Sequence, residues 1–473
     1  MIWREVPFVQ PRDVLMAQAG VAQTHLLCGG GKATQGWGSD WDLLVSAPRR
    51  VITIENGNMR VCNGPPQPVT HKSWQSTLAA SLNNLPRDLA LPDGLTPPVF
   101  VSGLVGMIGY ELATLFEPTL ELPPSPSALP DMVFGDYAGV AAFHRRSQRC
   151  FVFGEDEAFV AHLVGVVASG QGDGEDAARL LPGAVRLKAS KSPRAYKKSV
   201  QQVIDYILNG DIFQANLAQR LTGKLRSKKN WQRVAANLFC KMTEPSHASF
   251  GACLQFEQGT ILSNSPERYF NLRHEQDGLR VMAEPVKGTR PRLDDPIADK
   301  NIARDLVENE KDRAENIMIA DLVRNDLSRV CRDHSISEDK ICELRSYTYV
   351  HHLVSQISGT LREGLSALDV LATSFPCGSI TGAPKIGAME IIAELEGEGR
   401  GIYCGAIGFI DRSGAAEFSI PIRTATMEPL SRGALLRYGC GGGITILSDP
   451  SAEHQESLDK AVGFARLFED RSS

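Results

Sequence analysis

Apolar residues in the second half of the chain recur at the three- and four-residue spacing of amphipathic helices. One helix is expected to begin at Ser192-Pro193, which can cap and open it, and to end at Gly210. A second is expected over residues 309–328, and a third opens at TGAPK with Pro384 in its first turn. A fourth begins at Asp449-Pro450. Its expected buried stripe is Leu458, Ala461, Val462, Ala465 and Phe468.

Short segments with alternating apolar and polar residues are typical of β-strands. They are RRVITIENG (49–57), RCFVFGED (149–156), AIGFI (406–410), EFSIPIRTATM (417–427) and ALLRYG (434–439). Strands and helices follow one another without a regular βαβ rhythm, so the expected fold class is α+β. The proline-rich stretch 118–131 should be neither helix nor central strand, and the glycine-rich stretch 169–184 is the best candidate linker.

The composition is typical of a soluble globular protein, since the 473-residue chain is 42% hydrophobic and 22% charged. Its net charge of -5 does not favour nucleic acid or an acidic membrane surface as a partner. No apolar run approaches the roughly 18 residues of a membrane helix, and the N-terminus lacks a signal-peptide core. Ten scattered cysteines without a C-x-x-C pair indicate reduced thiols in a cytoplasmic protein.

Two pairs of carboxylates are spaced to share a helix face, Asp312 with Glu315 and Glu453 with Glu456. Each pair could be an ordinary solvated surface. Alternatively, the two helices could form opposite walls of a cleft that binds Mg²⁺, which prefers oxygen ligands and usually takes one or two protein carboxylates.

Three further features favour an anionic ligand. Arg423, in an apolar strand-like run, is either an exposed edge residue or a clamp for a carboxylate. Gly441–Gly443 is either a flexible turn or a run of N–H groups directed at an anion. The helix N-terminus at TGAPK (381–385) also favours negative charge. Together with the carboxylates, these features predict a site for an anionic, metal-bound small molecule.

Ordered motifs across residues 210–461 resemble the chorismate-utilising enzymes, which include component I of anthranilate synthase, component I of aminodeoxychorismate synthase, and the isochorismate and salicylate synthases. The resemblance implies large antiparallel sheets packed as a sandwich with helices outside. It also implies an N-terminal region (1–185) intertwined with a chorismate-binding catalytic region (186–473). The motifs are GDIFQANLAQR (210–220), SPERYF (265–270), PVKGTRPR (285–292), RAENIMIADLVRNDLSRV (313–330), VHHLVSQISGTL (350–361), FPCGSITGAPKIGAMEII (375–392), YCGAIGFI (403–410) and HQESLDKA (454–461).

The resemblance implies roles for residues at matching positions. Glu315 and Glu456 match magnesium ligands, Glu267 matches a proton donor and acceptor, and His352 matches a histidine beside the substrate ring. Gln214 stands where the isochorismate and salicylate synthases have a lysine that activates water, and its amide cannot act as that base. The residues expected to hold chorismate are Gly288, Thr289, Thr381, Tyr403, Arg423, Gly441, Gly442 and Gly443.

Lys287, in PVKGT, resembles the lysine of aminodeoxychorismate synthases, whereas anthranilate synthases typically have alanine there. This likeness implies that Lys287 attacks ring C2 and expels the C4 hydroxyl, and that ammonia at C4 then expels the lysine. The lysine must be neutral to attack, so its pKa of about 10.4 has to fall. Arg290 and Arg292, if they face the cleft, are expected to lower it together with Mg²⁺, and Glu284 is expected to raise it.

None of the ten cysteines lies in a glutaminase elbow, so ammonia is expected from a separate glutamine amidotransferase subunit. The chain ends soon after its last helix, which implies no fused lyase and a product that keeps its enolpyruvyl group. PSHAS (245–249) replaces the family's tryptophan-binding motif, so no tryptophan site is expected, and Cys377 replaces a common glycine. Two alternatives remain, an anthranilate synthase component I and a non-catalytic chorismate-binding homologue.

Overall fold

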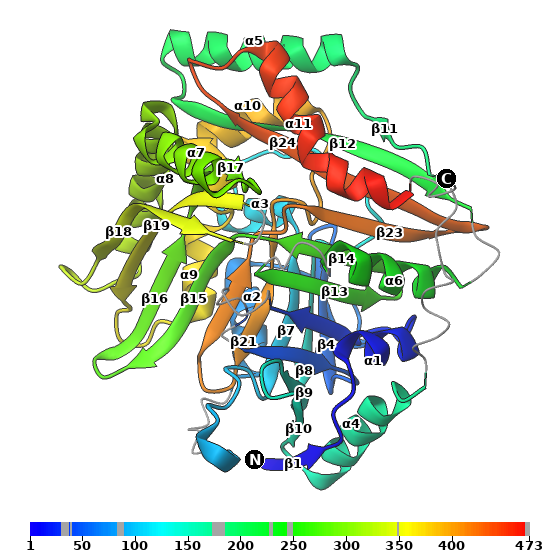
Figure 1. The fold of residues 1–473 in the computed structure, drawn as a ribbon. Helices are drawn as coiled ribbons and strands as arrows, with labels where there is room; N and C mark the ends of the chain where they lie inside the picture. The colour runs from blue at the N-terminus through cyan, green and yellow to red at the C-terminus, as the bar shows by residue number, and fades with distance from the viewer. Residues whose placement is uncertain are drawn as a thin grey trace.

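Two large antiparallel β-sheets form the centre of the molecule, and helices cover their outer faces (Figure 1). This arrangement confirms the expected α+β sandwich. Most of the predicted linker and of PSHAS lies outside the described residues. The computed structural model describes residues 1–29, 37, 40–82, 89–172, 185–226, 230–243, 249–347 and 350–468.

The first sheet ends at one edge with the N-terminal strand and at the other with strands from the middle of the chain. In sheet order its strands are β1 (Ile2–Val6), β10 (Arg149–Gly154), β9 (Gly139–His144), β3 (Trp41–Val45), β2 (His25–Cys28), β13 (Phe250–Phe256), β14 (Gly259–Ser265), β23 (Thr424–Leu430), β24 (Gly433–Ile444), β12 (Gln214–Leu225) and β11 (Lys188–Ala189), with β20 (Gly382–Ala383) paired to β12.

The second sheet is built in the same way. Each sheet combines strands from both sides of residue 185, and the expected division there stays a prediction. In sheet order the strands are β17 (Val286–Pro291), β19 (Val350–Thr360), β16 (Gly278–Glu284), β15 (Arg268–Glu275), β22 (Ala416–Ser419), β21 (Ala406–Asp411), β7 (Gly103–Ile108), β8 (Met132–Tyr137), β4 (Arg50–Glu55), β5 (Asn58–Val61) and β6 (Gln67–Pro68), with β18 (Ser337–Ser346) paired to β19.

The four helices expected from the sequence are all present. The Ser192 hydroxyl caps α5 by accepting the Ala195 N–H at 3.2 Å, and Gly210 ends it with a φ of +84°. None of the described helices is long and apolar enough to cross a membrane. The helices are α1 (Pro11–Ala17), α2 (His71–Ala79), α3 (Ala113–Phe116), α4 (Glu157–Ser169), α5 (Pro193–Asn209), α6 (Trp231–Thr243), α7 (Pro296–Glu308), α8 (Glu310–Ser328), α9 (Ala367–Ser374), α10 (Lys385–Glu396) and α11 (Pro450–Ala465).

Two details of the expected elements are wrong. The run 417–427 is not one strand, because the chain breaks before Arg423, whose φ of +51° is incompatible with an extended strand. In α11, Val462 is 38% exposed, while Glu453 and Ser457 are buried. Part of this helix packs on the glycine-rich, polar section of β24, so its buried face does not follow hydrophobicity alone.

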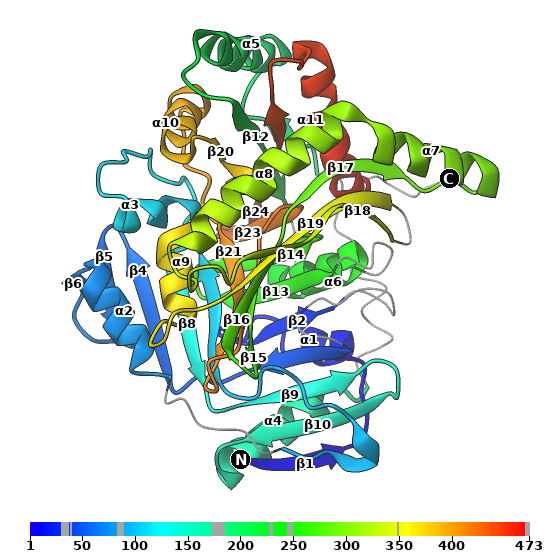
Figure 2. The ribbon, with the colours of Figure 1, turned by 90° about the vertical axis from the view of Figure 1, so that its left-hand side faces the viewer.

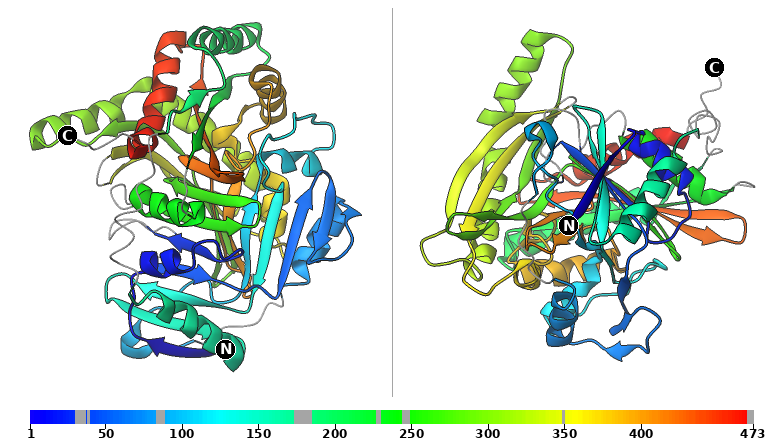
Figure 3. Two further views of the ribbon diagram at one scale, coloured as in Figure 1. Left: turned by 90° about the vertical axis from the view of Figure 1, so that its right-hand side faces the viewer. Right: turned by 90° about the horizontal axis from the view of Figure 1, so that it is seen from below.

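One core lies between the sheets, where Trp41 and Phe151 of the first sheet join Met107 and Phe409 of the second. Helices α1, α4, α6 and α11 cover the outer face of the first sheet, and α1 and α6 lie side by side there (Figure 3). Helices α2, α8 and α9 cover the second sheet (Figure 2), whereas α10 packs on β12 of the first sheet. At one end of the molecule, the β12–β24 pair meets β17, α8 and α11, and the polar cluster described next lies there.

Candidate active site

Lys287 lies in a polar cluster between β17, α8 and β24. Its Nζ is 3.1 Å from Oε1 of Glu315, and Nε2 of Gln214 donates to the same oxygen at 3.0 Å. A Cβ added to Gly443 would lie 2.6 Å from that oxygen. Glycine is therefore required at this point of β24, because any side chain would enter the space that the cluster occupies.

The backbone next to Lys287 brings β17 close to α8. Gly288 has a φ of +83°, a conformation that favours glycine. A Cβ there would lie 3.1 Å from Cδ1 of Leu306 and 3.2 Å from Cβ of Asp312. Gly288 thus permits both the local turn and the close approach that brings Lys287 to Glu315.

The acidic surroundings of Lys287 favour its charged form. Burial disfavours the ammonium, but Glu315 and Glu267, with a smaller contribution from Glu456, outweigh burial and raise the lysine pKa. Only 12% of the Lys287 side chain is exposed, so water screens these interactions poorly. At neutral pH the lysine is therefore an ammonium that neutralises the acidic cluster.

The expected help from two arginines is wrong. Nη2 of Arg290 lies 2.9 Å from Oδ2 of Asp312, and Nη2 of Arg292 lies 2.9 Å from Oδ2 of Asp299. Both guanidinium charges are compensated by these carboxylates. Neither arginine can therefore act as an uncompensated charge that lowers the pKa of Lys287.

The expected effect of Glu284 on the lysine is also wrong. Its carboxylate forms ion pairs with Arg268 and, at 2.6 Å, with Nη1 of Arg345. Glu284 is not among the groups with the largest effects on the pKa of Lys287. Its negative charge is satisfied locally, and it serves the packing of the second sheet.

Glu267 follows β14 and is buried beside the cluster. Burial raises the pKa of its carboxyl, against the opposing effects of a hydrogen bond with Ser379 and of the charges of Lys287 and Arg423. The Val286 N–H donates to its Oε1 at 3.4 Å. The raised pKa makes the protonated acid more accessible than for an exposed glutamate.

His352, on β19, is buried as a neutral imidazole. Desolvation and the charge of Arg423 lower its pKa to about 4. Its Nδ1 is 2.8 Å from the Thr289 hydroxyl, and its buried Nε2 has no hydrogen-bond partner. The adjacent His351 points to the other side of the strand, where its Nε2 lies 3.0 Å from Asp299.

Arg423 occupies the break between β22 and β23. Within the described part of the chain, no carboxylate forms an ion pair with its guanidinium, although Glu267 and Tyr438 act on it electrostatically. Burial lowers the pKa of Arg423, as expected for a charge removed from water. A half-buried guanidinium without an ion-pair partner among the described residues is well suited to bind a carboxylate.

The glycine run is part of a strand and not a flexible turn, and its role in holding an anion stays a prediction. Gly441, Gly442 and Gly443 lie inside β24 and pair in register with Ala218, Leu217 and Asn216 of β12. A Cβ at Gly441 would lie 2.2 Å from the Leu217 carbonyl oxygen. Because glycine has no side chain, these positions leave room for the polar side chains that pack against β24.

All four expected acids have polar partners, and the assignment of Glu315 and Glu456 as metal ligands stays a prediction. Asp312 pairs with Arg290, and buried Glu453 accepts a hydrogen bond from Ser448 at 2.6 Å. Glu315 lies beside Gly443, and Oε1 of Glu456 lies 3.5 Å from the Cβ position of neighbouring Gly442. The described residues contain no metal-binding group of three or more His, Cys, Asp and Glu side chains. A pair of carboxylates nevertheless fits Mg²⁺, which keeps most of its ligands from water and substrate.

Tyr403 and Thr381 differ in how far their side chains are buried. The Tyr403 ring covers Gly439, where a Cβ would lie 2.3 Å from it. Thr381 is fully buried, and its hydroxyl donates to the Cys377 and Gly378 carbonyls at 3.2 and 3.3 Å. The roles of both residues in holding a substrate stay predictions. Burial raises the pKa of the Cys377 thiol to about 12, which keeps it protonated.

Sequence reasoning missed two residues of the cluster. Ser379 forms a hydrogen bond with Glu267. Lys460 forms an ion pair with Glu456, in which Nζ lies 2.8 Å from Oε1. The Lys460 Nζ also donates to the Gly441 carbonyl at 2.9 Å. The sequence does indicate this ion pair, because Lys460 follows Glu456 by four residues on one helix. Ser379 had no comparable signal, because its contact with Glu267 depends on the tertiary fold.

Comparisons with known proteins agree with this architecture. A family model described as chorismate binding enzyme matches residues 31–466. The chain is 38% identical over 363 residues to aminodeoxychorismate synthase component 1 of Klebsiella aerogenes, covering 76% of each chain. It is 33% identical over 390 residues to anthranilate synthase component 1 of Thermus thermophilus, covering 79% and 78%. The crystal structure of anthranilate synthase component I from Streptococcus pneumoniae superposes with a TM-score of 0.76 and 26% identity, over 90% of this chain and 92% of that one.

Proposed function

The chain belongs to the chorismate-binding enzyme family, and we propose that it acts as component 1 of an aminodeoxychorismate synthase. The reaction converts chorismate and ammonia to 4-amino-4-deoxychorismate and water. The observation that carries the proposal is the buried Lys287, held 3.1 Å from Glu315. An amine inside the site allows nitrogen to enter at C4, the carbon that loses hydroxyl, through two displacements.

In the first displacement, the neutral amine of Lys287 forms a bond to ring C2. The ring double bond shifts, and the C4–O bond breaks. The departing hydroxyl needs a proton to leave as water. Glu267 is buried near Lys287 and has a raised pKa, so its protonated form is suited to supply that proton.

In the second displacement, the lone pair of ammonia forms a bond to C4. The double bond shifts back, and the C2–N bond breaks, so its electron pair returns to Lys287. The new amino group releases a proton, and the Glu267 carboxylate accepts it. Gln214 beside the lysine carries an amide, which is not a base able to activate water, and this supports amination over hydration.

Charged and polar groups around the cluster would bind the two carboxylates and the hydroxyl of chorismate. Glu315 and Glu456 would hold Mg²⁺, which when bound would anchor one substrate carboxylate and offset the negative charge that keeps Lys287 protonated. The unpaired guanidinium of Arg423 would bind the other carboxylate. The free Nε2 of neutral His352 would accept a hydrogen bond from the substrate.

The ammonia would come from a separate glutamine amidotransferase subunit. The aminodeoxychorismate synthase relatives are named as a first component, which supports the existence of a second. The product would retain its enolpyruvyl group, and a lyase acting on it would yield 4-aminobenzoate for folate synthesis. The isolated chain should accordingly use ammonium but not glutamine.

The main alternative is anthranilate synthesis on the same scaffold, and a product assay separates the two. The purified chain is incubated with chorismate, Mg²⁺ and ammonium, before and after addition of an aminodeoxychorismate lyase. Formation of 4-aminobenzoate only with the lyase supports the proposal. Fluorescent 2-aminobenzoate without the lyase would establish the anthranilate reaction, and unchanged chorismate would indicate a non-catalytic binding protein.

A further inference from the structure

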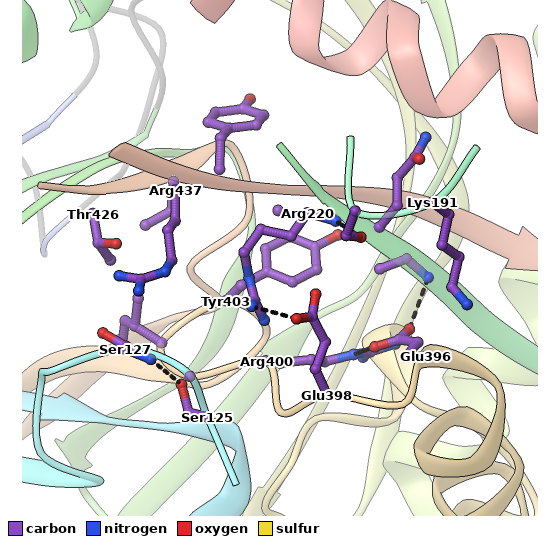
Figure 4. A pocket seen from close by; sticks show the side chains of 18 residues that line it. Ser125, Ser127, Lys191, Arg220, Glu396, Glu398, Arg400, Tyr403, Thr426 and Arg437 are labelled. Atoms are coloured by element: carbon purple, nitrogen blue, oxygen red, sulfur yellow. Dashed lines mark hydrogen bonds and ion pairs between the residues drawn. The ribbon is translucent and has the colours of Figure 1, made fainter. Parts of the chain in front are cut away.

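Arg400 carries a buried guanidinium just beyond the end of α10, on one wall of a small polar cavity (Figure 4). Its Nε and Nη2 lie 2.9 and 2.7 Å from the two carboxylate oxygens of Glu396, so the ion pair is bidentate. Only 3% of the Arg400 side chain is exposed. A buried charge is costly unless its donors are satisfied, so the partners of its remaining N–H groups are fixed parts of the fold.

These remaining N–H groups bind backbone carbonyls of two segments that lie beside the candidate active site. Nη1 donates to the Ile380 carbonyl at 2.9 Å, and Nη2 donates to the Asn216 carbonyl. Asn216 belongs to β12 and pairs in register with Gly443, whereas Ile380 ends the 3₁₀ helix Gly378–Ile380. The guanidinium therefore fixes this 3₁₀ helix against β12.

The 3₁₀ helix in turn contacts the proposed proton-transfer group. Ser379, the residue before Ile380, forms a hydrogen bond with the buried side chain of Glu267. Oε1 of Glu267 accepts the N–H of Val286 at 3.4 Å, and Val286 directly precedes Lys287. Each step from the guanidinium to the lysine is thus a hydrogen bond or a short stretch of covalent chain.

We propose that Arg400 is a positioning residue that holds Ser379 against Glu267. The inference rests on the proposed amination, in which Glu267 protonates the departing hydroxyl during the first displacement. Proton transfer requires the acid to lie within hydrogen-bond reach of the leaving oxygen, so a small displacement of Glu267 slows that step. Arg400 acts through Ser379 and does not touch the reacting atoms.

A serine hydroxyl suits this contact because it can both donate and accept a hydrogen bond. It donates to the Glu267 carboxylate and accepts from the protonated carboxyl. Glu267 passes through both forms in the proposed reaction, and the contact with Ser379 is maintained in each. The carboxyl therefore keeps one orientation while it releases and takes up the proton.

The role of Arg400 requires a guanidinium. Its planar fork reaches Glu396 and both carbonyls at once, and it also stacks on the Tyr110 ring at 4.8 Å. A lysine ammonium is a compact charge at the end of a flexible stem and cannot make all of these contacts. Arg400→Lys would keep the positive charge beside Glu396 but release the 3₁₀ helix.

Arg220 offers a matched control on the wall of the same cavity (Figure 4). Its Nη1 lies 3.0 Å from Oε2 of Glu398, and its Nη2 donates to the Gly399 carbonyl. Within the part of the chain that the structure describes, these guanidinium contacts do not include the 3₁₀ helix. Arg220→Lys therefore makes the same chemical change without affecting the connection to Glu267.

The test measures how fast the Lys287 adduct forms from chorismate and Mg²⁺ without ammonia. We expect Arg400→Lys to slow this step by about tenfold or more, since a positioned acid commonly contributes more than that to a rate. Arg220→Lys should stay within about twofold of wild type. The Kd of chorismate, measured by calorimetry in Lys287→Ala protein, should be the same with and without Arg400→Lys.

A double-mutant cycle with Ser379→Ala distinguishes positioning from general stability. Ser379→Ala removes the hydroxyl through which Arg400 acts, so adding Arg400→Lys should slow the reaction by no more than about a further twofold. Independent losses that multiply in the double variant would overturn the proposal. Equal slowing by Arg220→Lys would also overturn it, because the effect would then belong to the cavity wall as a whole.

A second pair of variants applies if Arg400→Lys fails to fold. Arg400→Gln combined with Glu396→Gln removes both buried charges together, and Arg220→Gln combined with Glu398→Gln is its control. The expected and opposing results are the same. If the unmodified protein forms neither adduct nor 4-amino product, the proposed function fails and the role of Arg400 fails with it. Normal adduct formation in every Arg400 variant would reject the role of Arg400 alone.

Discussion

The Nζ of Lys287 and the Oε1 of Glu315 lie 3.1 Å apart, in a cluster that excludes most solvent. The pair joins the proposed nucleophile to a proposed metal ligand. Without a bound cation, the charge of Glu315 helps keep the lysine protonated and unreactive. Binding of Mg²⁺ to Glu315 would weaken that effect, so metal binding and activation of Lys287 as a nucleophile are coupled.

Removing either proposed metal ligand should nearly abolish turnover. Glu315→Gln and Glu456→Gln keep the side-chain shape but remove the charge that a hard cation needs. We expect activity to fall by about 100-fold or more, with excess Mg²⁺ restoring little. Asp459→Asn, on the exposed face of α11, is the matched control. Near-normal rates in both glutamine variants would reject the metal assignment.

Arg423 should contribute mainly to substrate affinity. Its guanidinium lacks an ion-pair partner among the described residues, so Arg423→Gln would remove a charged contact without breaking an ion pair. The loss should be about 2 kcal/mol or more, equivalent to roughly 30-fold in Kd. Calorimetric titration of chorismate into Lys287→Ala protein, with and without the second change, measures binding without turnover. Equal affinities would contradict the clamp.

Neutral burial of His352 predicts a specific pH dependence of stability. The imidazole pKa is about 4 in the folded protein, against 6.5 for the ordinary group. The unfolded chain therefore binds more protons, and the stabilisation present above pH 6.5 is lost as pH falls towards 4. Between pH 7 and 5, wild type should lose about 2 kcal/mol more unfolding free energy than His352→Gln. Urea denaturation of both proteins at pH 7 and pH 5 measures this difference. If the imidazole is charged in the folded protein, the two proteins should lose the same unfolding free energy, which would contradict the neutral burial.

Glu284 should matter for stability and not for the lysine. Glu284→Gln breaks a buried pair with Arg268 and should lower the unfolding free energy by about 3 kcal/mol. Glu338→Gln alters an exposed pair with Arg324 and should change it by about 0.5 kcal/mol or less. The pH dependence of adduct formation at Lys287 should be the same in both variants. A shift in the Glu284 variant alone would show that its charge reaches the lysine.

Local signals predicted the helices well, because caps and stop residues such as Ser192 and Gly210 act within one turn. The same reasoning failed at Arg423, because a positive φ in an apolar run has no signature in the sequence. It also failed for α11, where the buried face includes Glu453. A helix that borders a polar site buries residues for that site as well as for the core.

The candidate site was predicted as a set of residues but not as a set of contacts. Residue types and motif order identified Lys287, Glu267 and Glu315. They did not reveal that Arg290 and Arg292 form ion pairs with aspartates, because those aspartates belong to α7 and α8. Electrostatic effects depend on which charges are already compensated, and the tertiary structure determines that.

The most direct test of the account is mass spectrometry of the protein mixed with chorismate and Mg²⁺ in the absence of ammonia. Lys287 should gain the mass of chorismate less one water, and peptide mapping should locate the adduct there. Lys287→Ala should form no adduct and lose most C4 amination, whereas Lys340→Ala, at an exposed position, should behave as wild type. Formation of 4-amino product by Lys287→Ala at the wild-type rate, or an adduct at another residue, would contradict the proposed mechanism.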